Sequence, residues 1–174
     1  LLREGFDFAR HPLSGLANGS LGWMQTANFL ISGLMVIAAG GGCRGVLGPK
    51  SRGVTWCLGA YGAAMIAAAF FPADPVDGFP PGTPPGMPTS ISTTGLLHFV
   101  AGALAFLCFG LSALFAARTL WRRGDRPLAA ASLVSGLTVL VGFFGGIAFG
   151  VIGIWIAVVA GWLWLSVLSF RLRY

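Results

Sequence analysis

Long runs of apolar residues, separated by short polar segments, dominate the chain. A helix that crosses the hydrocarbon core of a bilayer needs about 20 mostly apolar residues. Runs of this kind predict spans at approximately 21–39, 53–71, 94–117, 127–145 and 150–170. The pattern therefore predicts an all-α, polytopic transmembrane helix bundle with five spans, forming a single domain over residues 1–174.

Capping residues and glycines mark where several of these spans begin and end. Ser92 or Thr93 is expected to N-cap the third span, and Pro127 suits the first turn of the fourth. The stretch 127–170 carries no charged residue and is too long for one span. We divide it near 145–150, where glycines permit a tight turn.

The composition agrees with a membrane protein and excludes several other classes. Only 9% of the 174 residues are charged, whereas a soluble domain carries about a quarter. This low charge excludes a disordered chain, a nucleic-acid-binding module and an ordinary soluble enzyme. The net charge of +6 does not indicate nucleic acid as a partner, because the basic residues lie between the apolar runs and set orientation there.

The distribution of basic residues predicts the orientation in the membrane. Because cytoplasmic loops are enriched in lysine and arginine, loops 40–52 and 118–126 and the C-terminus are predicted to be cytoplasmic. Loop 72–93 and residue 1 are then extracytoplasmic. The basic residues on the predicted cytoplasmic side are Arg44, Lys50, Arg52, Arg118, Arg122, Arg123, Arg126, Arg171 and Arg173. This topology and the lack of an initiator methionine predict either a cleaved signal peptide or, preferably, a missing first helix that brings the number of spans to six.

Polar residues gather in the predicted outer half of the bundle. Gln25, Asn28 and Ser32 are spaced three and four residues apart, so they share one face of the first span. His98 lies roughly 6 Å below the start of the third span. An ionisable residue at such a position is by default a candidate functional residue. Asp74 follows the neighbouring span on the same side of the membrane, so we expect it to approach His98.

An Asp74–His98 pair has two interpretations. As catalytic residues, Asp74 orients His98, which acts as a general base on a water or hydroxyl. As structural residues, which is the interpretation we prefer, they form a hydrogen bond that fastens two helices. Ser90, Ser92 and Thr94 are conceivable hydroxyl partners of the pair. The candidate vestibule or substrate-binding residues are Gln25, Asn28, Asp77, Ser92 and Thr94, and the proline-rich loop 77–86 is a predicted lid or collar.

No metal site and no cofactor is predicted. Metal sites need three or four ligands in a spacing motif, and a haem held by two histidines would need a second histidine inside a span. The cysteines Cys43, Cys57 and Cys108 form no CxxC motif and are interpreted as reduced, structural residues. Small residues recur every fourth position at Gly142, Gly146 and Gly150, and at Gly153, Ala157 and Gly161. We interpret these rows as packing within the bundle in preference to a dimer interface.

Several motifs resemble those of a family of bacterial membrane proteins. They are Phe71-Pro72-Ala73-Asp74-Pro75, Gly78-Phe79-Pro80 and Gly95-Leu96-Leu97-His98, preceded by His11-Pro12-Leu13-Ser14 and Gly22-Trp23-Met24-Gln25. Together they extend over nearly the whole chain and resemble the multi-pass proteins known as domain of unknown function 998. The resemblance implies a bacterial plasma-membrane protein with six helices, the first missing here. It implies no activity, substrate or cofactor, and it directs attention to Asp74 and His98.

Three functions remain open from the sequence. The first is a lipid-interacting or accessory membrane component, with membrane lipids and other proteins of a membrane complex as partners and no nucleic acid. The second is an outer-leaflet hydrolase or transferase that acts on a lipid or lipid-linked substrate through Asp74 and His98. The third is a small transporter with a polar site at Gln25 and Asn28.

Overall fold

Within residues 3–172, which the computed structural model describes, the chain forms five long helices. They are α1 (Gly22–Leu47), α2 (Arg52–Phe70), α3 (Thr93–Arg122), α4 (Arg126–Phe144) and α5 (Gly146–Arg171). Each is long and apolar enough to span a membrane, which confirms the predicted all-α, multi-pass architecture. Two short 3-10 helices, η1 (Leu13–Ala17) and η2 (Pro49–Ser51), precede α1 and α2.

Local capping determines where two of the helices begin. Ser92 is the N-cap of α3, because its hydroxyl accepts a hydrogen bond from the Gly95 amide at 3.0 Å. Asp125 caps α4 in the same way, through the Leu128 amide at 3.2 Å. Pro127 lies in the first turn of α4, as predicted.

The first helix is longer than the predicted span. It continues beyond residue 39 to Leu47, and Gly48 follows it with a φ of 72°. Glycine has a low helix propensity, but Gly40 packs closely against Thr55 and Leu58 of α2. Tertiary packing therefore keeps the glycine-rich segment helical, and part of the predicted loop 40–52 is helix.

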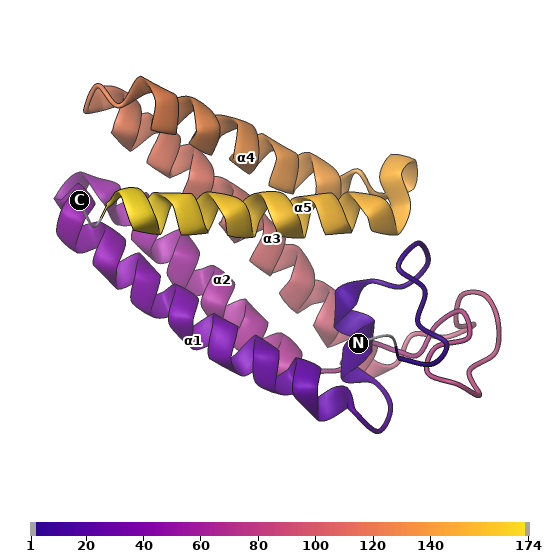
Figure 1. Ribbon diagram of the computed structural model, residues 1–174. Helices are drawn as coiled ribbons and strands as arrows, with labels where there is room; N and C mark the ends of the chain where they lie inside the picture. Colours follow the sequence, from indigo (N-terminus) through magenta and orange to yellow (C-terminus); the bar gives the residue numbers. More distant parts are fainter. Residues whose placement is uncertain (1–2, 173–174) are drawn as a thin grey trace.

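The helices pack in chain order, each antiparallel to the next (Figure 1). The extensive contacts are between α1 and α2, α2 and α3, α3 and α4, and α4 and α5. By comparison, the backbones of α5 and α3 come close at few positions. The bundle is therefore a series of helical hairpins, and α5 meets α3 mainly through side chains, with Trp162 and Trp164 packed against Phe109.

Three pairs of neighbouring helices meet at glycines, which we call the glycine crossings. The crossings are Gly33 with Gly62 (α1 and α2), Gly110 with Gly136 (α3 and α4), and Gly142 with Gly153 (α4 and α5). A Cβ atom added at either glycine of a crossing would meet the carbonyl oxygen of the other at 3.2 Å or less. Small residues allow this close approach of backbones, which stabilises helix pairs in a membrane.

The predicted rows of small residues serve packing inside the bundle at four of their six positions. Gly142 and Gly153 form a crossing, Ala157 packs against Gly142, and Gly161 lies under the Phe109 ring. By contrast, Gly146 and Gly150 have no neighbouring atom where a Cβ would stand. At Gly150 the φ of 53° interrupts the regular helix near the start of α5.

The two ends of the bundle differ in structure (Figure 1) and also in the charged residues that they carry. We call one the capped end, because residues 3–20 and 71–92 fold against each other there. The other is the basic end, which carries the turns at 48–51 and 123–125. The described basic residues at or near the basic end are Arg44, Lys50, Arg52, Arg118, Arg122, Arg123, Arg126 and Arg171. Which end faces the cytoplasm stays a prediction from this distribution.

Candidate functional site

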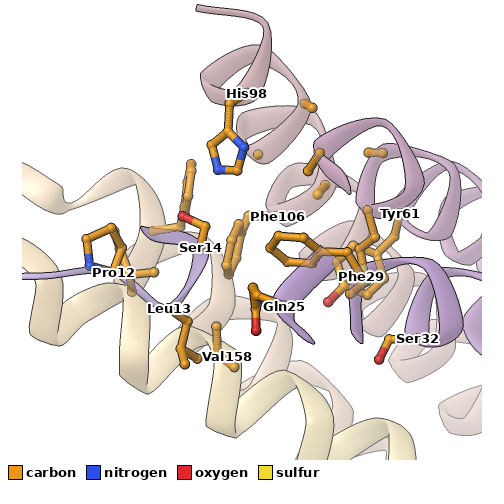
Figure 2. A pocket seen from close by; sticks show the side chains of 18 of the residues that line it. Pro12, Leu13, Ser14, Gln25, Phe29, Ser32, Tyr61, His98, Phe106 and Val158 are labelled. Atoms are coloured by element: carbon orange, nitrogen blue, oxygen red, sulfur yellow. The ribbon is translucent and has the colours of Figure 1, made fainter. Parts of the chain in front are cut away.

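A cavity of about 570 Å³ lies among the helices in the half of the bundle next to the capped end (Figure 2). All five helices and the segment around η1 contribute to its wall. Its volume falls within the range of small-molecule binding sites. We call it the central cavity.

The wall of the central cavity is mostly apolar. Its aromatic members are Phe29, Tyr61, Phe99, Phe106, Phe143 and Trp162. Apart from Tyr61 and Trp162, the polar side chains in the wall are Ser14, Gln25, Asn28, Ser32 and His98. Among the described residues, no Asp, Glu, Lys or Arg lines the cavity. Because an unpaired charge is costly in such surroundings, this wall suits a neutral and largely apolar molecule.

His98 connects the packing of α2 and α3 to the central cavity. Its side chain is 7% exposed, and its Nδ1 lies 2.7 Å from the carbonyl oxygen of Phe71. Because a carbonyl only accepts, Nδ1 carries the hydrogen and donates it. In neutral histidine the acceptor is then Nε2. Within residues 3–172 no group hydrogen-bonds to Nε2, and the ring points into the cavity (Figure 2).

The end of α2 explains why a histidine is needed at this place. Pro72 has no N–H, so the Ala68 carbonyl four residues earlier loses its amide partner. The His98 Nδ1 donates to the nearby Phe71 carbonyl at the same helix end. In hydrocarbon an unpaired carbonyl costs several kcal/mol, and His98 lowers this cost at the end of the helix.

Asp74 does not form the predicted hydrogen bond with His98. Its Oδ1 accepts from the Ser92 hydroxyl at 2.5 Å, and its Oδ2 accepts from the Ser92 amide at 2.9 Å. The carboxylate lies so close to Gly95 that a Cβ atom there would have no room. Thr94 extends the group through its hydroxyl, 2.9 Å from that of Ser92. Asp74 is therefore held at the N-terminus of α3, where the helix dipole favours a negative charge.

The capped end holds the N-terminal segment in place over the cavity. His11 is 1% exposed; its Nδ1 accepts from the Asp7 amide at 2.9 Å, and its Nε2 donates to the Asp77 carbonyl at 3.0 Å. The Asp77 side chain accepts from the Gly86 amide at 2.9 Å and lies 3.5 Å from Arg10. Asp77 thus stabilises the proline-rich loop, and the residues after His11 continue into the cavity wall.

Further contacts join the capped end to itself and to α5. Arg3 donates to the carbonyls of Leu16 and Asn18 at 2.6 and 2.7 Å. The side-chain Nδ2 of Asn18 donates to the Ala73 carbonyl at 3.0 Å. The Trp155 indole of α5 donates to the Phe8 carbonyl at 3.0 Å. These bonds link segments far apart in the sequence, so the capped end is a folded collar.

One carboxyl group of the capped end has a perturbed pKa. The Asp7 side chain accepts a hydrogen bond from the Ala9 amide at 2.8 Å and forms an ion pair with Arg10 at 3.1 Å. The hydrogen bond from Ala9, followed by the interactions with Arg10, lowers the pKa of Asp7 below its usual value.

The predicted site residues fall into two groups. Gln25, Asn28 and His98 line the central cavity, whereas Asp74, Asp77, Ser92 and Thr94 belong to the hydrogen bonds of the capped end. Ser14 and Tyr61 also line the central cavity, although neither was predicted from the sequence as a site residue. A tyrosine within an apolar span was a usable signal for Tyr61. For Ser14 the signal was weaker, since its position depends on the fold of the N-terminal segment.

Comparison with known proteins gives a result at the family level. A family whose description reads "Protein of unknown function (DUF998)" matches residues 1–171. No curated protein and no solved structure matches the chain. The chemistry of the central cavity therefore has to be inferred from its geometry.

Proposed function

Because the chain belongs to the DUF998 family of multi-pass membrane proteins, for which no activity is known, we propose a function from the central cavity: it binds a neutral membrane lipid. The lipid places a hydroxyl group against His98 and its apolar part along the aromatic wall. This proposal develops the first of the three functions considered from the sequence. Diacylglycerol is an example of the chemical class.

The single observation that carries the proposal is the hydrogen-bonding state of His98 inside an uncharged cavity. Nδ1 donates to the Phe71 carbonyl, so Nε2 offers a lone pair and needs a donor. A hydroxyl supplies that donor without bringing a charge. The absence of charged side chains among the described wall residues disfavours an anionic headgroup here.

The position of Asn28 supports access from the surrounding membrane. Asn28 lines the cavity from α1 and is nevertheless exposed at the surface of the bundle. The side-chain Oδ1 of Asn28 accepts a hydrogen bond from the Ser32 hydroxyl at 3.3 Å. The N–H groups of the Asn28 side chain remain available. A lipid therefore reaches the cavity beside α1 without passing through the capped end.

A photoreactive diacylglycerol tests the proposal directly. The purified protein is placed in phosphatidylcholine vesicles that contain a trace of diacylglycerol with a diazirine in its acyl chain. We expect crosslinks at Phe29 and Phe106. We expect the substitution Ala101→Leu, which fills the cavity from its wall, to reduce them several-fold. Ala38→Leu makes the same change at an exposed position of α1 and serves as the matched control.

Crosslinking in the wild type and in the two variants decides whether the lipid occupies the central cavity. Reduced crosslinking in Ala101→Leu, with Ala38→Leu like the wild type, supports the proposal. Equal crosslinking in all three proteins, or crosslinks confined to exposed residues on the outside of the bundle, contradicts it. A phosphatidylcholine carrying the same diazirine should label the central cavity less than diacylglycerol does.

A second function, an outer-leaflet hydrolase or transferase, is favoured by the same histidine. A hydrogen bond from Nδ1 to a carbonyl fixes the tautomer and leaves Nε2 as a general base. The orienting group is then the Phe71 carbonyl in place of Asp74, whose carboxylate is bonded to Ser92. This function requires turnover of a lipid by the intact protein, and its loss in a folded His98→Asn variant.

The transporter hypothesis gains no comparable support. Beyond the cavity, toward the middle of the bundle, the rings of Tyr61 and Phe109 stack at 4.1 Å. Phe109 is 1% exposed. A polar path from one end to the other would have to pass this packed region.

A further inference from the structure

A second cavity, of about 540 Å³, lies at the basic end between η2, the start of α2 and the end of α3. We call it the basic cavity. Its wall contains Lys50, Arg118, Arg122 and Arg123, and among the described residues no Asp or Glu. We propose that the basic cavity is a binding site for a phosphate group.

The positive charges of the basic cavity are not neutralised within the described chain. The ion pairs between residues 3 and 172 join Arg10 to Asp7, Arg10 to Asp77 and Arg171 to Asp125. None of them includes a residue of the basic cavity. A preference for positive loops explains why cations occur at this end, but it does not require four of them to share one cavity.

Two of the arginines stand at a spacing that is unfavourable without an anion. Arg118 and Arg122 are four residues apart on α3, so their side chains project from the same face of the helix. Like charges at this spacing repel each other. A phosphate group between them relieves the repulsion and accepts bidentate hydrogen bonds from their guanidinium groups.

Arg123 is held in place by a backbone group of another helix. Its Nη2 donates to the Val46 carbonyl at 3.1 Å, near the end of α1. A carbonyl at a helix end lacks an amide partner, so this bond ties the end of α3 to the end of α1. The remaining N–H groups of Arg123 are free to face the basic cavity.

The start of α2 adds a further positive contribution. The N-cap Ser51 makes no side-chain bond to the first turn of α2, and its hydroxyl donates to the Gly48 carbonyl at 2.7 Å. Gly53, in that first turn, lines the cavity and packs against the Phe115 ring. The N-terminus of a helix carries a partial positive charge that favours phosphate. It reinforces the four cationic side chains.

The phosphate can belong to a membrane phospholipid or to a soluble molecule. Both present the same oxygen atoms to the basic cavity, so the experiment measures both sources. The probes are dioleoyl phosphatidylglycerol, dioleoyl phosphatidylcholine and inorganic phosphate. Retention of the two lipids by detergent-solubilised protein is measured by native mass spectrometry. Binding of inorganic phosphate is measured as a thermal shift against chloride at equal ionic strength.

The central variant is Arg118→Gln/Arg122→Gln, measured beside each single substitution so that the result does not depend on the double variant folding. Arg44→Gln/Arg52→Gln is the matched control, because it removes two exposed charges from the same end outside the cavity wall. We expect binding of phosphatidylglycerol, inorganic phosphate or both to fall about tenfold or more in the double variant. Each basic side chain near a phosphate contributes about fivefold in affinity. The matched control should lose less than about threefold, because the two charges that it removes lie outside the cavity wall and are screened by salt.

The results assign the source of the phosphate or overturn the proposal. Loss of phosphatidylglycerol retention, with no effect of inorganic phosphate, assigns a lipid headgroup. A thermal shift from inorganic phosphate that depends on Arg118 and Arg122 assigns a soluble phosphate. The proposal is overturned if the single and double variants bind every probe as the wild type does. It is also overturned if binding falls as much in the matched control as in the double variant.

Discussion

Replacing His98 by alanine and by asparagine separates its hydrogen bond to the Phe71 carbonyl from its contact with the central cavity. Asparagine can keep the hydrogen bond, whereas alanine cannot. The asparagine Nδ2 stands at the same number of bonds from Cβ as the histidine Nδ1. His98→Asn therefore keeps the donor for the Phe71 carbonyl and removes the acceptor that faces the central cavity. His98→Ala removes both contacts.

The expected loss of stability follows from the Phe71 hydrogen bond. An interhelical hydrogen bond in a membrane contributes ~0.6 kcal/mol on average. A buried carbonyl left without a partner costs about 1–3 kcal/mol. For His98→Ala we therefore expect a loss of about 2 kcal/mol in the free energy of unfolding. In a chain of this size each kcal/mol shifts the melting temperature by about 2–4 °C, so the expected decrease is about 4–8 °C.

The assay combines thermal unfolding in detergent with the diacylglycerol crosslinking described above. His98→Asn should melt within about 3 °C of the wild type, since it keeps the hydrogen bond. Crosslinking should fall in both variants, because both lack the Nε2 acceptor. Equal destabilisation by the two substitutions would refute the assignment of Nδ1 as the stabilising donor. Full crosslinking in His98→Asn would refute the contact between Nε2 and the lipid hydroxyl.

Three other substitutions or conditions test the remaining features of the fold. Ser92→Ala removes the N-cap of α3 and should cost about 1 kcal/mol in thermal unfolding without changing diacylglycerol crosslinking; a normal melting temperature would argue against the cap. Gly62→Ala places a Cβ against the Gly33 carbonyl and should destabilise by about 2 kcal/mol or more, whereas Gly41→Ala, where no atom lies within 4 Å, should be neutral or stabilising by up to ~1 kcal/mol. If both glycine substitutions gave the same melting temperature, the crossing would have no energetic role. The lowered pKa of Asp7 makes its contribution to stability present above the unfolded pKa of 3.8 and lost as the pH falls through the lower folded value. The protection factors of residues 3–20, which are exchange rates divided into the intrinsic rate at each pH, should therefore fall at acidic pH, and Asp7→Asn should abolish that pH dependence.

The spans were predictable because their signal is local. A run of about 20 apolar residues specifies a membrane helix whatever it packs against, and Ser92 caps a helix through an amide three residues away. The extension of α1 to Leu47 depends on Gly40 packing against α2. The sequence of α1 alone does not predict that contact, so the extension was not predicted.

The site was predictable only where side-chain direction follows from helix periodicity. Gln25 and His98 line the central cavity because they lie on the faces of α1 and α3 that form its wall. Asp74 lies in a loop, and its sequence position did not decide between His98 and the N-terminus of α3. The actual partner of His98 is a carbonyl at the end of α2, where a proline has removed an amide. Side-chain types alone do not reveal such a backbone partner.

The glycine crossings have a consequence for how the protein is made. Each crossing joins two helices that are consecutive in the chain, so it can close as soon as the second helix of a hairpin has entered the bilayer. Local contacts of this kind form fast, since little chain entropy is lost in closing them. The central cavity instead needs residues as far apart as Pro12 and Trp162. During synthesis the hairpins can therefore form before the central cavity exists, and the proposed lipid would find its complete site only after the last helix has docked.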